Sequence, residues 1–262
     1  MKQNMDNINI REFFWKIRSW IFCKKNTKKN IIACKFIKEH TDQLVKQFSG
    51  KTPIQKPTDN PIGIFMAGSP GAGKTEFSKR FLEAFFNQHE FVRIDADEIR
   101  DFLPKNLYNG KNAHVIQNAA TIGVQKLYDH VLKTHKNFIL DATFSHYKLC
   151  RKNIARALKP SRERKIFIFY VYQDPKLAWE FTKAREYKEG RHIRKKDFIR
   201  SFLDTPVVIN KIKSEFGSKI KLHLFIKNND NIGIEKFHMN ISNIDSYIKE
   251  RYDKQRLLDI LS

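Results

Sequence analysis

The sequence predicts an α/β fold in which a mostly parallel sheet lies between two layers of helices, preceded by an N-terminal helical segment. Three observations lead to this fold class. From residue 61 onward, short apolar runs rich in Ile, Val or Phe alternate with amphipathic segments of helix length, which is typical of βαβ units. A glycine-rich loop joins the first run to the first such segment. Before residue 51, apolar residues recur instead at helical spacing.

The apolar runs are expected to form the strands. They are Ile62–Gly68, Phe91–Ala96, Phe138–Ala142, Lys165–Tyr172 and Lys221–Ile226. The segments between them are expected as helices on the two faces of the sheet, and residues 241–261 as a closing helix. We therefore interpret residues 61–262 as one domain.

The first fifty residues form a basic helical segment, which we interpret as a separate unit with a regulatory role. One helix face would carry the apolar side chains of Phe13, Phe14, Ile17, Trp20 and Ile21. Residues 51–60, with Pro53 and Pro57, have the composition of a linker. The predicted boundaries are thus residues 1–50, 51–60 and 61–262.

The composition narrows the classes of partner. The chain has 262 residues and a net charge of +22, which favours nucleotides, nucleic acid or another polyanion as partners, or else simply reflects a lysine-rich surface. Three cysteines without a C-x-x-C spacing predict a reduced, cytoplasmic protein. The apolar stretch at residues 13–22 contains Lys16 and Arg18 and is too short to span a bilayer, so we expect neither a signal peptide nor a membrane partner. The 22 phenylalanines have no functional explanation at this stage.

A glycine-rich loop after the first predicted strand matches the pattern G-x-x-x-x-G-K-[ST]. Its residues are Gly68, Ser69, Pro70, Gly71, Ala72, Gly73, Lys74 and Thr75. The glycines let backbone N–H groups turn toward one anion, and the helix that begins near Gly73 directs its positive end to the same place. Lys74 is expected on the β- and γ-phosphates of ATP, and the Thr75 hydroxyl on Mg²⁺.

Two further predicted strands end in acidic residues. Asp95 and Asp97 follow the second strand, where one can cap the next helix and the other can act as a general base. Asp141 ends the third strand, where it can hold Mg²⁺ through water or bind substrate. Thr143, two residues later, can contact substrate or cap a helix. Ligands of open parallel sheets bind at these strand ends, which places all four residues near the loop.

Two arginines follow the fourth predicted strand. Arg185 lies late on a helix, and Arg191 lies just beyond Gly190, which is expected to end that helix. Guanidinium groups stabilise the charge that develops on a transferred phosphoryl group. The alternative for either arginine is an ordinary solvated surface position.

These elements, in this order, resemble the zeta-toxin family of kinases over roughly residues 61–205. The shared elements are the glycine-rich loop, Ile-Asp-x-Asp-x-x-Arg at 94–100, Asp-Ala-Thr at 141–143 and the two arginines. The resemblance implies a P-loop kinase with a three-layer fold that uses ATP and Mg²⁺. It also implies phosphorylation of an amino-sugar hydroxyl of UDP-N-acetylglucosamine, by which such a toxin of a toxin–antitoxin system blocks cell-wall synthesis.

The resemblance also implies residue roles. Lys74 and Thr75 match the loop lysine and the magnesium hydroxyl, and Asp97 rather than Asp95 matches the catalytic base. The other implied roles are ATP-phosphate contact for Arg185 and Arg191, and substrate binding for Arg100, Asp141 and Thr143.

Two departures from the family pattern fall on the sugar side of the site. The family often has Glu-Gly-Thr where this chain has Asp-Ala-Thr at 141–143, and it carries a sugar-binding glutamate in the segment that corresponds to residues 112–118, which contains no acid here. The acceptor therefore stays open. A polynucleotide or other nucleotide-type kinase is the second hypothesis, and an ATP-gated binding protein is the third. A base at Asp97 argues against the third.

The partner of the aromatic N-terminal face stays open as well. An exposed face that apolar needs to be buried against something. The alternatives are an anionic membrane surface, the core of the same protein, and the nucleotide cleft, where the segment would restrain a toxic kinase within one chain. We favour the last of these three alternatives, with a separate antitoxin as the other possible restraint.

Overall fold

The computed structural model describes residues 28–54, 60–86, 88–110, 112–159, 163–189, 192–228 and 233–261. Its strands form one sheet with the order β2-β3-β1-β4-β5-β6. Their bounds are β1 (Ile62–Ala67), β2 (Phe91–Asp95), β3 (Asn137–Asp141), β4 (Lys165–Tyr172), β5 (Ile220–Lys227) and β6 (Ile234–His238). The first five pair in parallel, and β6 pairs antiparallel with β5 at the edge. The predicted α/β class and the mostly parallel sheet are confirmed.

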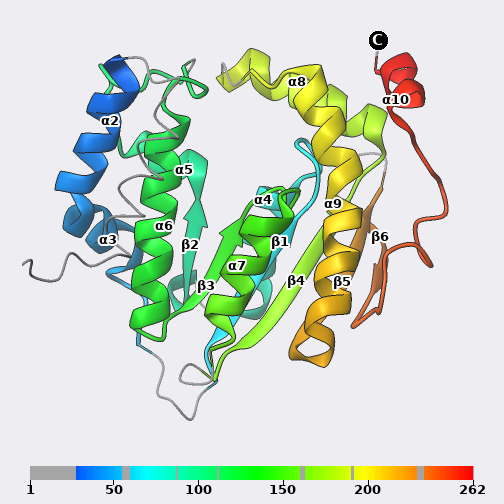
Figure 1. Ribbon diagram of the computed structural model, residues 1–262, viewed down its shortest axis with the longest axis horizontal. Helices are drawn as coiled ribbons and strands as arrows, with labels where there is room; N and C mark the ends of the chain where they lie inside the picture. Colours follow the sequence, from blue (N-terminus) through cyan, green and yellow to red (C-terminus); the bar gives the residue numbers. More distant parts are fainter. Residues whose placement is uncertain are drawn as a thin grey trace, which may run out of the picture.

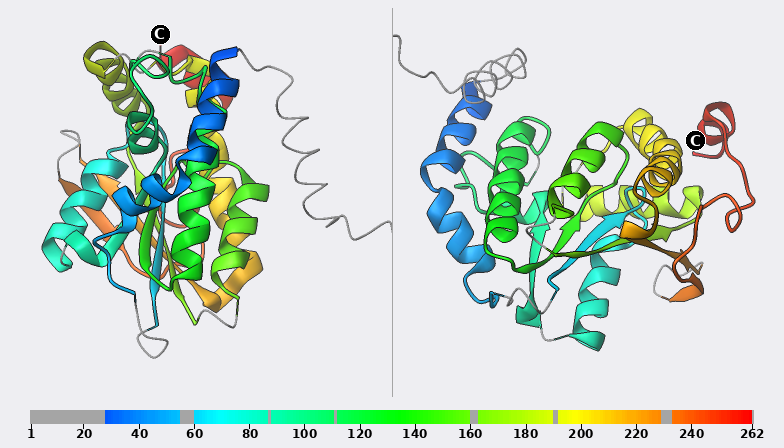
Figure 2. Two further views of the ribbon diagram at one scale, coloured as in Figure 1. Left: turned by 90° about the vertical axis from the view of Figure 1, so that its left-hand side faces the viewer. Right: turned by 60° about the horizontal axis from the view of Figure 1, so that its bottom comes forward.

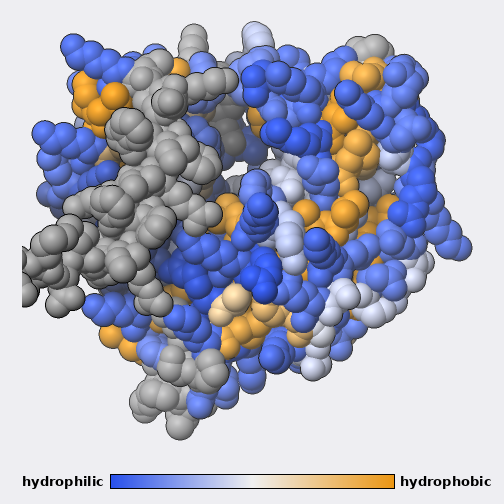
Figure 3. Space-filling model, in the orientation of Figure 1, coloured by the Kyte–Doolittle hydropathy of each residue, from blue (hydrophilic) through white to orange (hydrophobic). Residues whose placement is uncertain are grey.

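Helices cover the two faces of the sheet unequally. Those of the domain are α4 (Lys74–Phe85), α5 (Ala96–Asp101), α6 (Gln117–Lys133), α7 (Tyr147–Ala157), α8 (Pro175–Glu189), α9 (Lys195–Phe216) and α10 (Lys254–Ile260). Figures 1 and 2 show α6, α7 and α9 on one face and α4 on the other. The face with three helices is mostly hydrophilic outside, with hydrophobic residues gathered along α9 (Figure 3).

The prediction of a closing helix over residues 241–261 is wrong for most of its length. Only residues 254–260 are helical, as α10, whose N-cap Asp253 accepts a hydrogen bond from the Arg256 N–H. Before it, Asn243 accepts hydrogen bonds from the backbone N–H and the hydroxyl of Ser246. Asparagine and serine side chains compete in this way with helical backbone hydrogen bonds, which is why the apolar pattern there did not produce a helix.

Side chains that alternate between the two faces of the strands form a hydrophobic core on each side of the sheet. On the α6 side, Phe65 of β1 packs edge-on against Tyr128 and Phe138, and all three are fully buried. On the α4 side, Ile64 and Met66 of the same strand lie in a second cluster. Because successive strand residues point to opposite faces, β1 contributes to both cores and lies at the centre of the domain.

Residues 28–49 form two helices that pack into the first of these cores. They are α2 (Lys28–Glu39) and α3 (Thr41–Ser49). Ile37 and Leu44 are fully buried, and Gly123 of α6 lies so close that an added Cβ would be 2.5 Å from Ile99 and 3.4 Å from Leu44. The aromatic face predicted at residues 13–21 lies outside the described residues. The predicted functional boundary at residue 50 stays a prediction. In packing, α2 and α3 belong to the core of the domain that follows them.

Two further expectations concern the cysteines and membrane-spanning helices. Cys34 and Cys150 are free thiols in the described part of the chain, and burial raises the pKa of the Cys150 thiol to about 12. Among the described helices, none combines the length and apolar character that crossing a bilayer requires.

Candidate active site

The glycine-rich loop lies between the end of β1 and the start of α4. Gly71 and Gly73 have φ angles of 74° and 75°, which L-residues with side chains rarely adopt. A Cβ on Gly71 would lie 1.9 Å from the carbonyl oxygen of Ala178, so the loop also needs a glycine to pass beneath α8. The loop therefore has the conformation that a phosphate cradle at a helix N-terminus requires.

Lys74 and Thr75 begin α4 and face the same small region. The Lys74 ammonium donates a hydrogen bond to the carbonyl oxygen of Ser69 at 2.8 Å, and its burial lowers its pKa, against the opposing effect of the Asp141 carboxylate. The Thr75 hydroxyl donates to Asp141 Oδ2 at 3.0 Å. The loop residues and the acid at the end of β3, which are 66 positions apart, thus meet directly.

Arg93 is a site residue that the sequence interpretation missed. It lies on β2 with its guanidinium 2.6 Å from Asp141, 3.0 Å from Asp95 and 2.9 Å from Glu98. The parallel register places Asp95 and Asp141 opposite each other, so a cation between them offsets their repulsion. Burial raises the pKa of Asp141, which Lys74 and Arg93 oppose. A lone arginine inside an otherwise apolar strand was the available signal.

The two acids after β2 have different environments. Asp95 is the N-cap of α5, where its Oδ1 accepts a hydrogen bond from the Asp97 N–H at 2.9 Å. Asp97 presents its carboxylate to the cavity and forms an ion pair with Arg100. Arg100 in turn donates to the amide oxygen of Gln117 at 2.5 Å. One acid therefore caps the helix, while the other is held toward the cavity by a buried arginine.

A cavity of about 300 Å³ brings these groups together. The predicted residues that line it are Pro70, Gly71, Gly73, Lys74, Thr75, Asp95, Asp97, Arg100, Asp141, Thr143 and Arg185. Sequence reasoning did not assign a role to the lining residues Glu76, Ala96, Gln117, Ala142, Thr182 and Ile193. The remaining predicted loop residues, Gly68, Ser69 and Ala72, are not among the residues that line the cavity.

The predictions for Arg185, Arg191 and Thr143 compare differently with the structure. Arg185 lies on α8 over the loop and is paired with Glu189 at 3.2 Å. Arg191 lies outside the described residues. The Thr143 hydroxyl is 3.0 Å from the Ser145 hydroxyl, and since the N-cap of α7 is His146, Thr143 does not cap that helix.

The residues around Thr75 fit a magnesium ion. A threonine hydroxyl beside an aspartate offers the hard oxygen ligands that Mg²⁺ prefers. No cluster of three or more acidic, histidine or cysteine side chains that could hold a metal occurs within the described ranges. Mg²⁺ in phosphoryl-transfer sites usually takes most of its ligands from phosphate oxygens and water.

A carboxylate that faces a phosphate loop across one cavity can accept a proton from an acceptor while the loop binds the donor phosphates. This is the arrangement of a P-loop phosphotransferase. The model of the zeta toxin family matches residues 46–238, well over half of the chain, and the chain therefore belongs to that family. It is accordingly an ATP-dependent phosphotransferase, and a hydroxyl acceptor is consistent with the family.

Solved structures with the same fold include one toxin–antitoxin system and one further protein complex. The chain is similar to the PezAT toxin–antitoxin system of Streptococcus pneumoniae, with a TM-score of 0.62 and 17% identity over 86% of this chain and 92% of that chain. It is also similar to the native AvrRxo1-ORF1:-ORF2 complex (TM-score 0.60, 14% identity, 85% and 78% coverage) and to that complex with ATP (0.58, 13%, 78% and 65%). At such identities the likeness establishes the fold alone. Comparison with curated protein sequences gives no match.

Proposed function

We propose that this enzyme transfers the γ-phosphoryl group of ATP to a hydroxyl of a sugar nucleotide such as UDP-N-acetylglucosamine, and that it acts as the toxin of a toxin–antitoxin type system. The observation that carries the proposal is the single cavity shared by the phosphate loop and the Asp97–Arg100 pair. The donor and the acceptor can bind there side by side.

On the donor side, the loop and the start of α4 bind the phosphates. The N–H groups of the loop and the positive end of α4 favour an anion at this position. The Lys74 ammonium donates a hydrogen bond to the Ser69 carbonyl oxygen. Because the lysine side chain is long and flexible, it can exchange this bond for contacts with the β- and γ-phosphates. Arg185, on α8 above the loop, is placed to contact phosphate oxygens from the other side.

Thr75 and Asp141 are the residues that would hold Mg²⁺, directly or through water. Bound magnesium would neutralise charge on the β- and γ-phosphate oxygens. Arg93 keeps the Asp141 carboxylate in place from the opposite side, because its guanidinium lies 2.6 Å from Asp141 Oδ2.

On the acceptor side, Asp97 is proposed as the general base. It accepts the proton of the acceptor hydroxyl as the oxygen forms a bond to the γ-phosphorus, the bond from that phosphorus to the β–γ bridging oxygen breaks, and ADP leaves. Arg100 orients the carboxylate through its ion pair and is itself fixed by Gln117. The N-cap role of Asp95 leaves Asp97 as the acid available for this step.

The choice of a sugar nucleotide is supported by the polar groups beside the base. Gln117 lies in the segment where the family carries a sugar-binding glutamate, and its amide can both donate and accept hydrogen bonds to sugar hydroxyls. The Thr143 hydroxyl is a second such group. A net charge of +22 favours capture of an anionic diphosphate acceptor.

The test is a transfer assay with γ-labelled ATP. The acceptors are UDP-N-acetylglucosamine, other sugar nucleotides and DNA or RNA with free 5′-hydroxyl ends, with Lys74→Ala as the inactive control. We expect label on a sugar nucleotide only with the wild-type protein. Label on nucleic-acid ends alone would replace this proposal with a polynucleotide kinase.

We also propose that the kinase is restrained, either by an antitoxin or by its own first 27 residues. The PezAT structure is described as a toxin–antitoxin system, which supports an antitoxin here. The start of α2, where residues 1–27 join the described part of the chain, lies at the end of the molecule where the parallel strands end, on the same side as the phosphate loop (Figure 1). The cytoplasm, where ATP and sugar nucleotides occur together, is the compartment that fits this reaction.

Deletion of residues 1–27 tests restraint within the chain. Residues 28–49 must be kept, because α2 and α3 are part of the core. Stronger growth inhibition by the shortened chain, absent in its Lys74→Ala version, would support restraint by the segment. Equal inhibition by the two chains at equal expression would exclude the segment as the restraint and leave a separate antitoxin as the alternative.

A further inference from the structure

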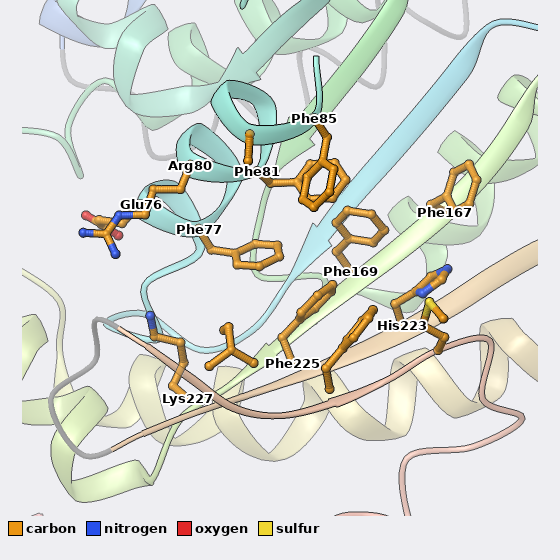
Figure 4. Close-up of a pocket in the computed structure, with 14 residues that line it drawn as sticks. Glu76, Phe77, Arg80, Phe81, Phe85, Phe167, Phe169, His223, Phe225 and Lys227 are labelled. Atoms are coloured by element: carbon orange, nitrogen blue, oxygen red, sulfur yellow. The ribbon is translucent and has the colours of Figure 1, made fainter.

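The sheet has an uncovered half on its α4 side. Helix α4 packs on β1 and β3, whereas β4, β5 and β6 carry no helix on this face within the described residues. A groove of about 790 Å³ runs there between α4 and the three strands (Figure 4). Sheets built from parallel strands normally have helices over both faces, so this half of the face lacks its usual cover.

Phenylalanine rings form the walls and floor of this groove. Those of α4 are Phe77, Phe81 and Phe85, and those of the strands are Phe167, Phe169, Phe225 and Phe237. The two groups meet, with ring centroids of Phe77 and Phe225 4.3 Å apart and those of Phe81 and Phe169 5.0 Å apart. They account for many of the phenylalanines that the sequence left unexplained.

The rim of the groove exposes apolar side chains to solvent. Phe85 is 70% exposed, Met239 67% and Phe237 47%. Together with the groove they make one continuous apolar surface. A contiguous exposed apolar surface of this kind, bordered by polar residues, marks a site of interaction with another molecule.

We propose that the groove binds one amphipathic helix of a partner protein, and that the polar face of this helix is acidic. The shape fits a helix, because three strands at a spacing of about 4.8 Å leave a strip about as wide as one helix, roughly 10 Å. A partner helix laid beside α4 would complete the missing half of the layer and cover the exposed rings.

The charges at the rim specify an acidic partner. Arg80 lines the groove at an exposed position, and the exposed Lys221 lies with its ammonium 5.8 Å from the Phe167 ring centroid, whereas Glu76 is the acidic residue of the lining. Lys227 also lines the groove but is only 5% exposed, so it contributes little to the charge of the rim. The whole chain carries +22, which opposes association with a second copy and attracts an acidic protein.

The N-terminal segment of the same chain matches this groove poorly in charge. Its apolar stretch at residues 13–22 contains Lys16 and Arg18 and is followed by Lys24 and Lys25. Basic side chains beside a basic rim would repel one another, so the charge favours a separate, acidic molecule as the occupant.

This inference goes beyond the proposed function and is tested by binding, without reference to phosphoryl transfer. The probe is a fluorescein-labelled 16-residue peptide with leucines along one helical face and glutamates elsewhere, followed by anisotropy with the full-length protein at 150 mM salt. A second peptide has lysine at every glutamate position. Phe85→Asp with Met239→Asp alters the groove, and Ile31→Asp, at a 53% exposed position of α2, is the matched control.

We expect the glutamate peptide to bind at least about tenfold more tightly than the lysine peptide, since rim charges set partner choice. The Phe85→Asp/Met239→Asp variant should lose this binding, and Ile31→Asp should keep it. Arg80→Glu combined with Lys221→Glu should reverse the preference between the peptides. Unchanged melting curves establish that the variants, all at exposed positions, remain folded.

Three results would overturn the proposal. The first is no binding of either peptide, or equal binding of both. The second is a wild-type dimer in sedimentation velocity that Phe85→Asp/Met239→Asp makes monomeric, which would assign the groove to a second copy. The third is binding to vesicles of phosphatidylglycerol and phosphatidylcholine that the same substitutions abolish while neither peptide binds, which would assign it to a membrane.

Discussion

Helix α4 separates two regions of opposite chemistry. Its first turn, with Lys74 and Thr75, meets the charged groups at the strand ends, where hydrogen bonds and ion pairs join the side chains. Its other side presents Phe77, Phe81 and Phe85, spaced four residues apart, to an aromatic groove. Residues at i and i+4 lie on one stripe of a helix, so one short segment serves both regions.

The difference lies in what each region needs in order to act. The charged cavity depends on polar atoms held at fixed distances, because catalysis requires preorganised dipoles and charges. The groove depends on apolar area and shape, which tolerate small displacements. Substitutions in the cavity should therefore remove activity at little cost in stability, and substitutions in the groove should do the reverse.

The largest effect is expected at Asp97. Asp97→Asn removes the proton acceptor at nearly constant size, and loss of a general base typically lowers the rate about 10²- to 10⁴-fold. Binding of ATP, measured by calorimetry, should change little. Asp95→Asn is the comparison, because asparagine caps a helix about as well as aspartate does, and the main loss should be stability from the weakened ion pair with Arg93. If Asp95→Asn instead shows the large loss of rate, the roles of the two acids are reversed.

The loss of rate in Lys74→Ala should be almost as large as that in Asp97→Asn. Removal of one preorganised cation or donor from a developing charge lowers the rate on the order of 10³-fold. The melting temperature should hardly fall, because Lys74 makes its hydrogen bond to a carbonyl of its own loop and is buried at a cost. Activity of the variant near that of the wild type would contradict the assignment of the phosphate loop.

A substitution of Arg93 tests whether a residue of the cavity can contribute to both stability and activity. Arg93→Met leaves Asp95 and Asp141 without their shared cation, and breaking such a buried cluster costs about 3–5 kcal/mol. We expect a lower melting temperature and also weaker Mg²⁺-dependent binding of nucleotide, measured by titration of the metal. A loss of stability with an unchanged dependence on Mg²⁺ would make Arg93 purely structural.

The two regions were predictable from the sequence to different extents. The phosphate loop and the acids at 95, 97 and 141 follow from adjacent residues and from the rule that strand ends bind ligands. The contact between Arg93 and Asp141 joins residues 48 positions apart, and its signal was one arginine in an apolar run. Strand β6 was not predicted, because its residues are almost all exposed and lack the alternation of a half-buried strand.

The groove was invisible for a similar reason. Its rings come from α4, β4, β5 and β6, and Phe77 touches Phe225 only because two distant segments meet in the fold. The sequence revealed an excess of phenylalanine but not its location. Periodicity indicates which face of an element is apolar, and it does not indicate whether another element covers that face.

The smallest effect is expected in the groove itself. Phe81 is half-buried and packs against Phe169 and Phe85, so Phe81→Ala should lower the free energy of unfolding by about 2 kcal/mol, less than full burial would give. Phe85→Ala is the matched control on the same stripe of α4, because a ring that is 70% exposed should contribute within about 0.5 kcal/mol. Both variants should keep the kcat of the wild type in the transfer assay, since neither ring lines the cavity. Chemical denaturation gives the stability and initial rates give the activity. A large fall in kcat for Phe81→Ala without a fall in stability would mean that α4 transmits changes in the groove to the phosphate loop, and the two regions would then be coupled.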